Sequence, residues 1–329
     1  MIIGGIIALC TAWVVLKSIF VRGRDLDPGE RLDLSANPRL RDVLREVADK
    51  IGTRPVDAVY LTPGTEIAVF ERGGMTARLR GRAERCLVIG AGVLQGMDLL
   101  AFKGILAHEY GHFKNEDTAG GALSLAVRRS IFAMAMGLAA QGTATWYNPA
   151  WHFVNRFYKV FVRISHGATR LQEILADRWA AFAYGSEAFA RGLTHVVRRS
   201  IEFDTHVNRT LNEVIEQKLP LANLYGYSPK PGDDHAKAAE EAEGAIADAL
   251  SRSASEYDSH PPPCDRIAWV RALAVESPSD ERETEAWTLF ADRAAIEAKL
   301  TADVRERIRE EHGVNIAAPT PEAFDAIPA

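Results

Sequence analysis

The sequence AHEYGH constrains the fold of this chain more than any other feature. It lies in a run of apolar residues spaced three and four apart, which predicts a helix over residues 98–115 with Asp98 as its N-cap. On such a helix His108 and His112 lie one turn apart on one face, where two neutral imidazoles can take adjacent corners of a tetrahedral zinc site. Glu109 lies about 100° around the helix from His108, close to the metal but free to contact its water. The pattern therefore predicts a metal-binding helix.

Two histidines alone do not complete a zinc site that also binds water, because such a site needs a third protein ligand. The best candidate is Glu173 in LQEILAD, which belongs to a run with helical periodicity. Asp177 follows four residues later and so lies on the same helix face. There its carboxylate can accept the remaining N–H of a ligating histidine and fix its tautomer. The two acids also fit a solvated helix face, an alternative that the presence of HEYGH disfavours.

Residues 1–21, MIIGGIIALCTAWVVLKSIFV, predict a transmembrane anchor. They carry one charge, Lys17, and at about 1.5 Å per residue they reach the roughly 30 Å of a hydrocarbon core. A cleaved signal peptide is disfavoured, because no basic residue precedes the apolar stretch and no small-x-small cleavage site follows it. Arg22, Arg24 and Arg31 come after the stretch, so the positive-inside rule places the rest of the chain in the cytoplasm. We expect a single-pass protein of the cell (inner) membrane.

The remainder of the chain predicts a mainly helical α+β fold, with a small sheet packed on a helical body. Residues 39–51 have helical periodicity after an Asn-Pro pair. Short apolar or alternating runs, separated by turn signals, predict strands over residues 58–61, 67–70 and 86–89. The acidic stretch 229–259 predicts a solvated hinge or insertion with an exposed helix. Residues 276–329 predict a C-terminal helical region, over 281–312, and a loose tail.

Composition limits the class of protein. With 47% hydrophobic and 25% charged residues, the chain has the composition of a folded globular protein, which argues against a disordered chain and a polytopic membrane protein. The formal net charge of -5 argues against a non-specific nucleic-acid binder. Cys10, Cys86 and Cys264 include no CxxC pair, so neither a disulfide framework nor a thiolate cluster is expected. Nitrogen and carboxylate ligands must therefore hold any metal.

The segment between the two metal-binding motifs, residues 118–172, is basic and partly apolar. It contains no acidic residue, and its basic residues are Arg128, Arg129, Arg156, Lys159, Arg163 and Arg170. Residues 130–141 are strongly apolar, and residues 151–164 combine aromatic and basic residues at helical spacing. This pattern predicts a membrane-proximal helical insertion that lies on an anionic leaflet. A helical pair packed over the metal helix, with its cations paired to acidic neighbours, fits the pattern equally well.

Three motifs together, HEYGH, then EILAD, then HPPPCDR, resemble the membrane-associated gluzincin metallopeptidases of family M48. That family includes the CAAX prenyl endopeptidase and the bacterial heat-shock membrane protease, and the nearer resemblance is to bacterial members with few membrane spans. The resemblance covers residues 38–275 and implies a zincin-like metallopeptidase domain over residues 22–275. It also implies one zinc ion per chain.

The resemblance implies a role for each residue of the first two motifs. His108, His112 and Glu173 would bind Zn²⁺ as its protein ligands. Glu109 would be the general base, and Asp177 would match the aspartate that follows the third ligand.

The third motif and the strand before the metal helix complete the resemblance. It implies that His260 and Arg266 stabilise the reaction intermediate, whereas taken alone they fit a turn histidine and a surface arginine better. Residues 86–89 would be the edge strand that pairs with an extended substrate.

The predicted function is hydrolysis of internal peptide bonds in membrane-associated or unfolded proteins. The expected partners are a protein or peptide substrate and membrane lipid, with no nucleic acid. The alternative is a membrane-anchored, non-catalytic scaffold with a structural or degenerate metal site. A structural zinc site normally closes with four protein ligands, and the sequence offers three, which favours catalysis.

Overall fold

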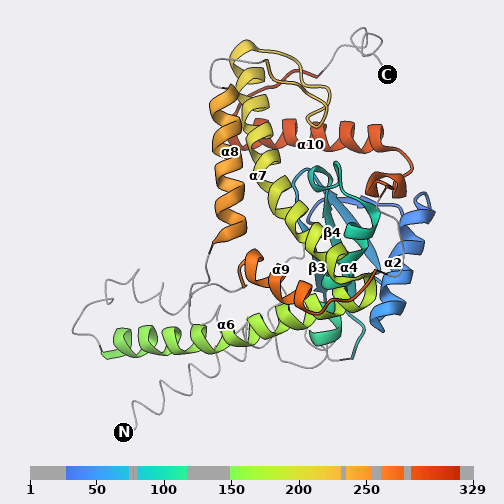
Figure 1. Cartoon of the computed structure of the whole chain (residues 1–329). Coiled ribbons are helices and arrows are strands. Elements are labelled where there is room, and N and C mark those ends of the chain that lie inside the picture. Colours follow the sequence, from blue (N-terminus) through green and yellow to red (C-terminus); the bar gives the residue numbers. More distant parts are fainter. Residues whose placement is uncertain are drawn as a thin grey trace.

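The computed structural model describes residues 27–73, 77, 80–116, 149–230, 235–252, 261–277 and 283–318. The predicted anchor over residues 1–21, residues 118–148 of the basic segment, and His260 lie outside the described residues. Within the described segments the fold is α+β and mainly helical with a small sheet, as predicted (Figure 1). In those segments, no helix combines the length and the apolar composition that crossing a bilayer requires.

One four-stranded sheet has the order β1-β2-β4-β3. The strands are β1 (Glu30–Leu32), β2 (Ala58–Thr62), β3 (Ile67–Arg72) and β4 (Glu84–Gly90). The two outer pairs, β1 with β2 and β3 with β4, are antiparallel, and β2 and β4 run parallel in the middle with Val59 opposite Leu87. The three strands predicted from the sequence are therefore confirmed.

The expectation that residues 86–89 form a substrate-pairing edge strand is wrong. They belong to β4, which pairs with β2 on one side and with β3 on the other. Cys86, Leu87 and Ile89 are fully buried, and a continuous apolar run covered on both faces is typical of an inner strand. The edge of the described sheet that lies beside the metal-binding helix is instead β3.

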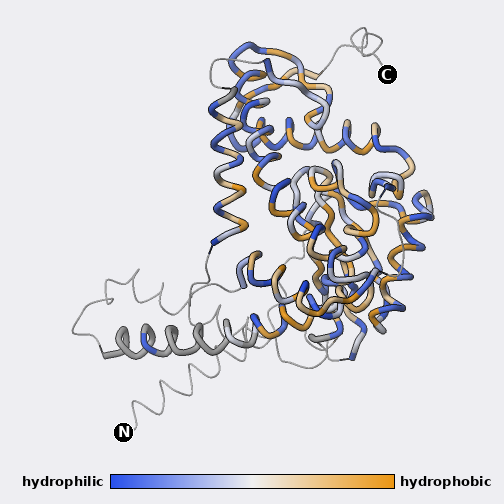
Figure 2. The backbone as a smooth tube through the Cα atoms, in the orientation of Figure 1, coloured by the Kyte–Doolittle hydropathy of each residue, from blue (hydrophilic) through white to orange (hydrophobic). Residues whose placement is uncertain are grey.

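Helices α2 (Pro38–Ile51) and α4 (Leu99–Glu116) pack together in the main core. α2 begins with a proline, which suits the first turn, and ends at Gly52, whose φ of 75° is left-handed. α4 begins at the predicted N-cap, because Asp98 Oδ1 accepts a hydrogen bond from the Ala101 N–H at 2.8 Å. Strand β3 and helices α2, α6 and α7 contact α4, and most of its apolar side chains are buried. Figure 2 shows the hydrophobic residues concentrated around the sheet and α4.

Five further helices follow α4 in the described part of the chain. They are α6 (Pro149–Tyr184), α7 (Ser186–Gln217), α8 (His235–Ser251), α9 (Pro263–Ala272) and α10 (Arg293–His312), with short 3-10 turns η1 (Ala91–Val93) and η2 (Ala286–Leu289). Gly185 separates α6 from α7, and its φ of 95° favours glycine. α6 and α7 both pack against α4, and α9 contacts both of them. Figure 1 shows the first half of α6 extending away from the other described elements.

Candidate metal centre

Helices α4 and α6 bring the three predicted metal-binding side chains together. His108 and His112 come from successive turns of α4, and Glu173 comes from α6. The two histidine Nε2 atoms are 3.1 Å apart, and the Glu173 carboxylate oxygens lie 3.6 Å from His108 Nε2 and 3.5 Å from His112 Nε2. A tetrahedral zinc ion with bonds of about 2.0–2.1 Å needs ligand atoms about 3.4 Å apart. The donor set therefore fits zinc, and no fourth His, Cys, Asp or Glu of the described residues joins it.

A glycine allows the two ligand-bearing helices to approach each other. Gly111 lies between the two histidines in sequence, and it faces Ala176 of α6. A Cβ atom at position 111 would meet the Ala176 Cα at 3.0 Å and its Cβ at 3.2 Å. The short interhelical distance that brings Glu173 to the histidines therefore requires a residue without a side chain here.

Asp177 supports His108 from the side opposite the metal position. Its Oδ1 lies 2.8 Å from His108 Nδ1, so the ring N–H can donate to it and direct Nε2 at the metal. Arg266 of α9 binds the same carboxylate, with Nε 2.9 Å from Oδ2 and Nη2 2.6 Å from Oδ1. Burial alone would raise the pKa of Asp177, but the hydrogen bonds from Arg266 and His108 hold it below its usual range. The carboxylate is therefore ionised and suited to orient the ligand.

The ring of Phe189, on α7, covers His108. The two ring centroids are 5.6 Å apart with an interplanar angle of 28°, and Phe189 is fully buried. The guanidinium of Arg266 lies 5.8 Å from the same phenyl centroid. These contacts restrict rotation of the imidazole. The sequence did not reveal this neighbour, because an apolar residue at helical spacing looks like any core residue.

His112 is held in the protonation state that binds a metal. Burial lowers its pKa to about 4, and the positive charge of Arg266 acts in the same direction. The ring is therefore neutral at pH 7, and its lone pair is available without competition from a proton.

Glu109 faces the edge strand. The backbone N–H of Val69 in β3 lies on the side of its carboxylate and favours the ionised form. Burial raises the pKa of Glu109 to about 7, the negative charge of Glu173 adds to this shift, and the positive charge of Arg266 opposes it. Part of the side chain stays exposed. A carboxyl group that titrates near neutral pH can both accept and release a proton there.

Of the last two predicted site residues, His260 and Arg266, the structure describes only Arg266. His260 lies outside the described residues. Arg266 is only 9% exposed, and beyond its two bonds to Asp177 its Nη1 lies 3.5 Å from Glu173 Oε2. The structure therefore brings Arg266 to the metal-binding carboxylate as well as to the supporting one.

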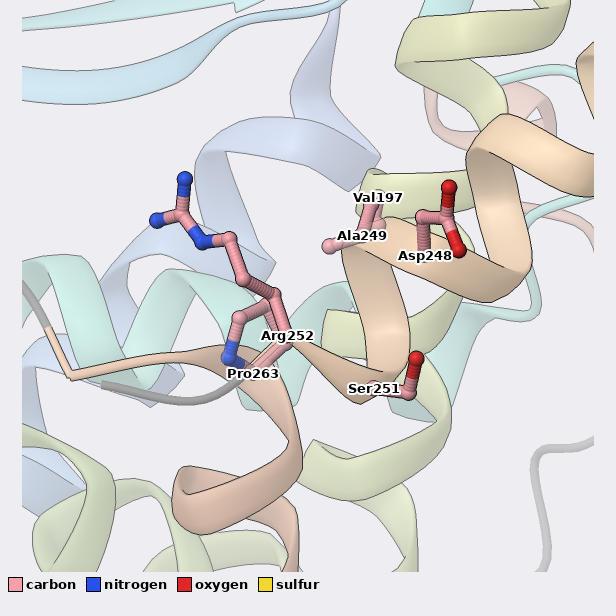
Figure 3. Close-up of a pocket in the computed structure, with 6 residues that line it drawn as sticks. All are labelled: Val197, Asp248, Ala249, Ser251, Arg252 and Pro263. Atoms are coloured by element: carbon pink, nitrogen blue, oxygen red, sulfur yellow. The ribbon is translucent and has the colours of Figure 1, made fainter. Parts of the chain in front are cut away.

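A separate hollow of about 520 Å³ lies between α7, α8 and the start of α9 (Figure 3). It is lined by Val197, Asp248, Ala249, Ser251, Arg252 and Pro263. None of these residues belongs to the metal centre, so the hollow is distinct from the candidate site.

The helix with HEYGH and the glutamate from a later helix define a class of metal-binding proteins with three protein ligands. Within that class, the chain belongs to Peptidase family M48, whose sequence profile matches residues 35–274.

Individual relatives are more distant. A protein named Protease HtpX homolog from Pelotomaculum thermopropionicum is 30% identical over 94 residues, which cover 29% of this chain and 31% of that protein. Another of the same name, from a Sulfurihydrogenibium species, is 29% identical over 108 residues, covering 30% of this chain and 34% of its own length. The matches thus span about a third of these relatives. No solved structure matches the chain.

Proposed function

We propose that this protein is a zinc-dependent endopeptidase. The observation that carries the proposal is the convergence of His108, His112 and Glu173, whose candidate ligand atoms all lie within 4.8 Å of one another. Glu109 lies on the turn between the two histidines. When bound, a zinc ion would polarise the scissile carbonyl and acidify a water molecule. Membership of a peptidase family supports this proposal.

Glu109 has the properties of the general base. It would take a proton from the attacking water and return that proton to the nitrogen of the leaving amine, which balances the hydrolysis. A pKa of about 7 suits both transfers, because the group is neither fully protonated nor a very weak base at neutral pH. The carboxylate lies close to β3, where the Val69 N–H favours its ionised form.

Strand β3 offers the backbone edge along which an extended substrate would lie. It pairs with β4 on one side, and in the described sheet no strand pairs with its other side. Its outer edge is next to α4 and to Glu109, so a peptide added there would pass the metal centre. Recognition through backbone hydrogen bonds favours exposed or unfolded segments over folded domains.

Arg266 and His260 would have different roles, the first in positioning a metal ligand and the second in stabilising the oxyanion. Because the Arg266 guanidinium binds Asp177 in a bidentate way, we assign it to holding that carboxylate and, through it, His108. Stabilisation of the oxyanion would then fall to His260, as the family resemblance implies, with Arg266 contributing its positive charge.

Residues 1–21 would anchor the protein in the cell membrane, with the metal centre on the cytoplasmic side. Their length, apolar composition and the basic residues that follow them support this assignment. Fractionation of cells that express the full chain tests it, because an anchored protein stays with membranes after a high-salt wash.

The Glu109→Gln variant tests the proposed reaction. It keeps the size of the side chain and all three metal ligands, so we expect full zinc content and loss of casein cleavage by at least about 100-fold. Cleavage near the wild-type rate would refute Glu109 as the base. If zinc-loaded wild type cleaves no protein substrate, the non-catalytic scaffold becomes the better interpretation.

A further inference from the structure

The turn between β2 and β3 leads directly into the outer strand of the sheet. Because β4 lies between β2 and β3, residues 63–66 must cross the end of β4 to reach β3. The Gly90 N–H donates a hydrogen bond to the Glu66 carbonyl at 2.6 Å. The Gly92 N–H donates one to the Gly64 carbonyl at 2.8 Å. The position of this turn therefore determines where β3 begins.

The turn fits tightly against η1, and η1 fits tightly against α7. A Cβ atom added to Gly90 would lie 2.3 Å from the Gly64 carbonyl oxygen. One added to Gly92 would lie 2.9 Å from that oxygen and 2.9 Å from the ring of Phe203 on α7. Arg199, also on α7, donates from Nε and Nη2 to the Gly92 carbonyl at 3.3 and 3.1 Å. One side of the turn thus rests on a fixed support.

Tyr225 supports the turn from another segment. It lies in the loop that follows α7, and its hydroxyl donates a hydrogen bond to the Pro63 carbonyl at 3.2 Å. Its ring stacks on Phe203, with centroids 5.6 Å apart and an interplanar angle of 19°. It packs against the main core and against a second apolar cluster. The buried members of that second cluster are Phe203, Val214, Leu221, Leu224 and Ile316.

Hydrogen bonds hold the loop of Tyr225 on α10. The Tyr225 N–H donates to Asn223 Oδ1 at 2.9 Å, and Asn223 Nδ2 donates to Glu297 Oε2 at 2.8 Å. The Leu224 N–H donates to Thr301 Oγ1 at 3.0 Å. Glu297 and Thr301 are buried, where an unmade hydrogen bond is costly. The Tyr225 hydroxyl is therefore presented to the turn by a fixed segment.

We propose that Tyr225 is a positioning residue for the substrate: through the Pro63 carbonyl it keeps the β3 edge where an extended peptide can pair with it. The proposal rests on the proposed endopeptidase function. An added peptide strand binds through backbone hydrogen bonds, which weaken steeply when donor and acceptor are misaligned. The hydrogen bonds and ring contact of Tyr225 join its loop, α7 and the turn, whereas the metal ligands belong to α4 and α6.

Loss of the hydroxyl should weaken binding of the peptide and leave its hydrolysis unchanged. Without the bond to Pro63, the turn samples positions in which β3 is not aligned, so only a fraction of the molecules can pair with a peptide. A peptide that has paired with β3 itself holds the strand aligned, so the chemical step proceeds at its usual rate. One hydrogen bond of this kind corresponds to about 3–10-fold in apparent affinity.

Kinetics of the Tyr225→Phe variant test the proposal, because the change removes the hydroxyl and keeps the stacked ring. The matched control is Tyr227→Phe, which loses a hydroxyl from the same loop, beside Glu213 of α7 and packed on the second apolar cluster. The substrate is an unstructured casein peptide that carries a fluorophore and a quencher, added to the zinc-loaded full-length protein. We expect KM to rise about 3–10-fold in Tyr225→Phe only. The value of kcat, and the zinc affinity in a chelator competition, should match those of wild type.

Two measurements in a Glu109→Gln background separate this proposal from the endopeptidase proposal, because they need no cleavage. Fluorescence anisotropy of the labelled peptide should show an affinity loss of about 3–10-fold when Tyr225→Phe is added. Amide hydrogen exchange should become faster over residues 63–72 and stay unchanged over α4. A wild type that binds the peptide but does not cleave it would refute the endopeptidase, and the two measurements would still decide the role of Tyr225.

Four outcomes would overturn the positioning role. Unchanged KM and peptide affinity in Tyr225→Phe would show that β3 stays aligned without the hydroxyl. A fall in kcat at constant KM would place the effect in the chemical step. An equal rise in KM in Tyr227→Phe would assign the effect to the stability of the whole loop. A wild type that does not bind the peptide at all would overturn both proposals.

Discussion

Replacing Gly111 with alanine tests how closely α4 and α6 must approach. The added Cβ would lie 3.0 Å from the Ala176 Cα, which is backbone, so no change of rotamer relieves the contact. One helix must shift by a few tenths of an ångström. Gly111 directly precedes His112, and Glu173 comes one turn before Ala176, so the shift separates the metal ligands.

Two opposing effects determine how much Gly111→Ala changes the free energy of unfolding. Alanine in place of glycine stabilises a helix interior by about 1 kcal/mol, whereas overpacking a tight contact costs about 1–3 kcal/mol. The net effect of Gly111→Ala should therefore be a loss of about 0–2 kcal/mol. Gly244, exposed in α8, is the matched control, because an added Cβ meets nothing within 4 Å there. Gly244→Ala should gain about 0.5–1 kcal/mol, which leaves a gap of about 1–3 kcal/mol between the variants.

Urea unfolding of both variants in the same detergent measures this gap, and competition with a chromogenic chelator measures zinc affinity. We expect Gly111→Ala to weaken zinc binding by about 10-fold or more, as do other changes that displace the support of a ligand, and Gly244→Ala to leave it unchanged. If Gly111→Ala matches the control in both stability and zinc affinity, the close approach of α4 and α6 does not shape the metal centre.

Other predictions address the surroundings of the site. Arg266→Lys loses the bidentate bond to Asp177 and should weaken zinc binding about 10–100-fold in the chelator competition; unchanged affinity would contradict the positioning role. Burial alone would raise the pKa of Glu46, but the hydrogen bond and charge of Lys103 lower it below its ordinary value of 4.5. The ion pair therefore stabilises the fold fully above pH 4.5, and this stabilisation is lost as the pH falls through the lowered pKa of Glu46. Because the Glu46 carboxylate is 38% exposed and partly screened by solvent, Glu46→Gln should lower the unfolding free energy at pH 7 by only about 0.5–1 kcal/mol, and urea titrations should show wild type and variant converging as the pH falls below 4.5. Burial raises the pKa of Cys86 to about 11, so a thiol reagent at pH 8 should modify it only after unfolding, as mass spectrometry of the labelled peptide would show.

The sequence alone determined the local half of the metal centre. His108 and His112 share a face because a helix repeats every 3.6 residues, and Glu173 and Asp177 share one for the same reason. Asp98 could be predicted as an N-cap because capping depends on the few residues around it. Helical and alternating periodicity likewise predicted α2, α4 and three strands of the sheet, β2, β3 and β4, but not the short β1.

Only the tertiary structure decided the order of the strands and the contacts between the helices. Residues 86–89 were predicted as an edge strand but lie inside the sheet, because strand order depends on pairing between distant segments. Arg266 binds Asp177 across 89 residues of sequence, and the stacking of Phe189 on His108 depends on where α7 crosses α4. Periodicity orients a side chain about its own helix axis, whereas contacts between helices depend on how closely their backbones pack, which no local pattern specifies.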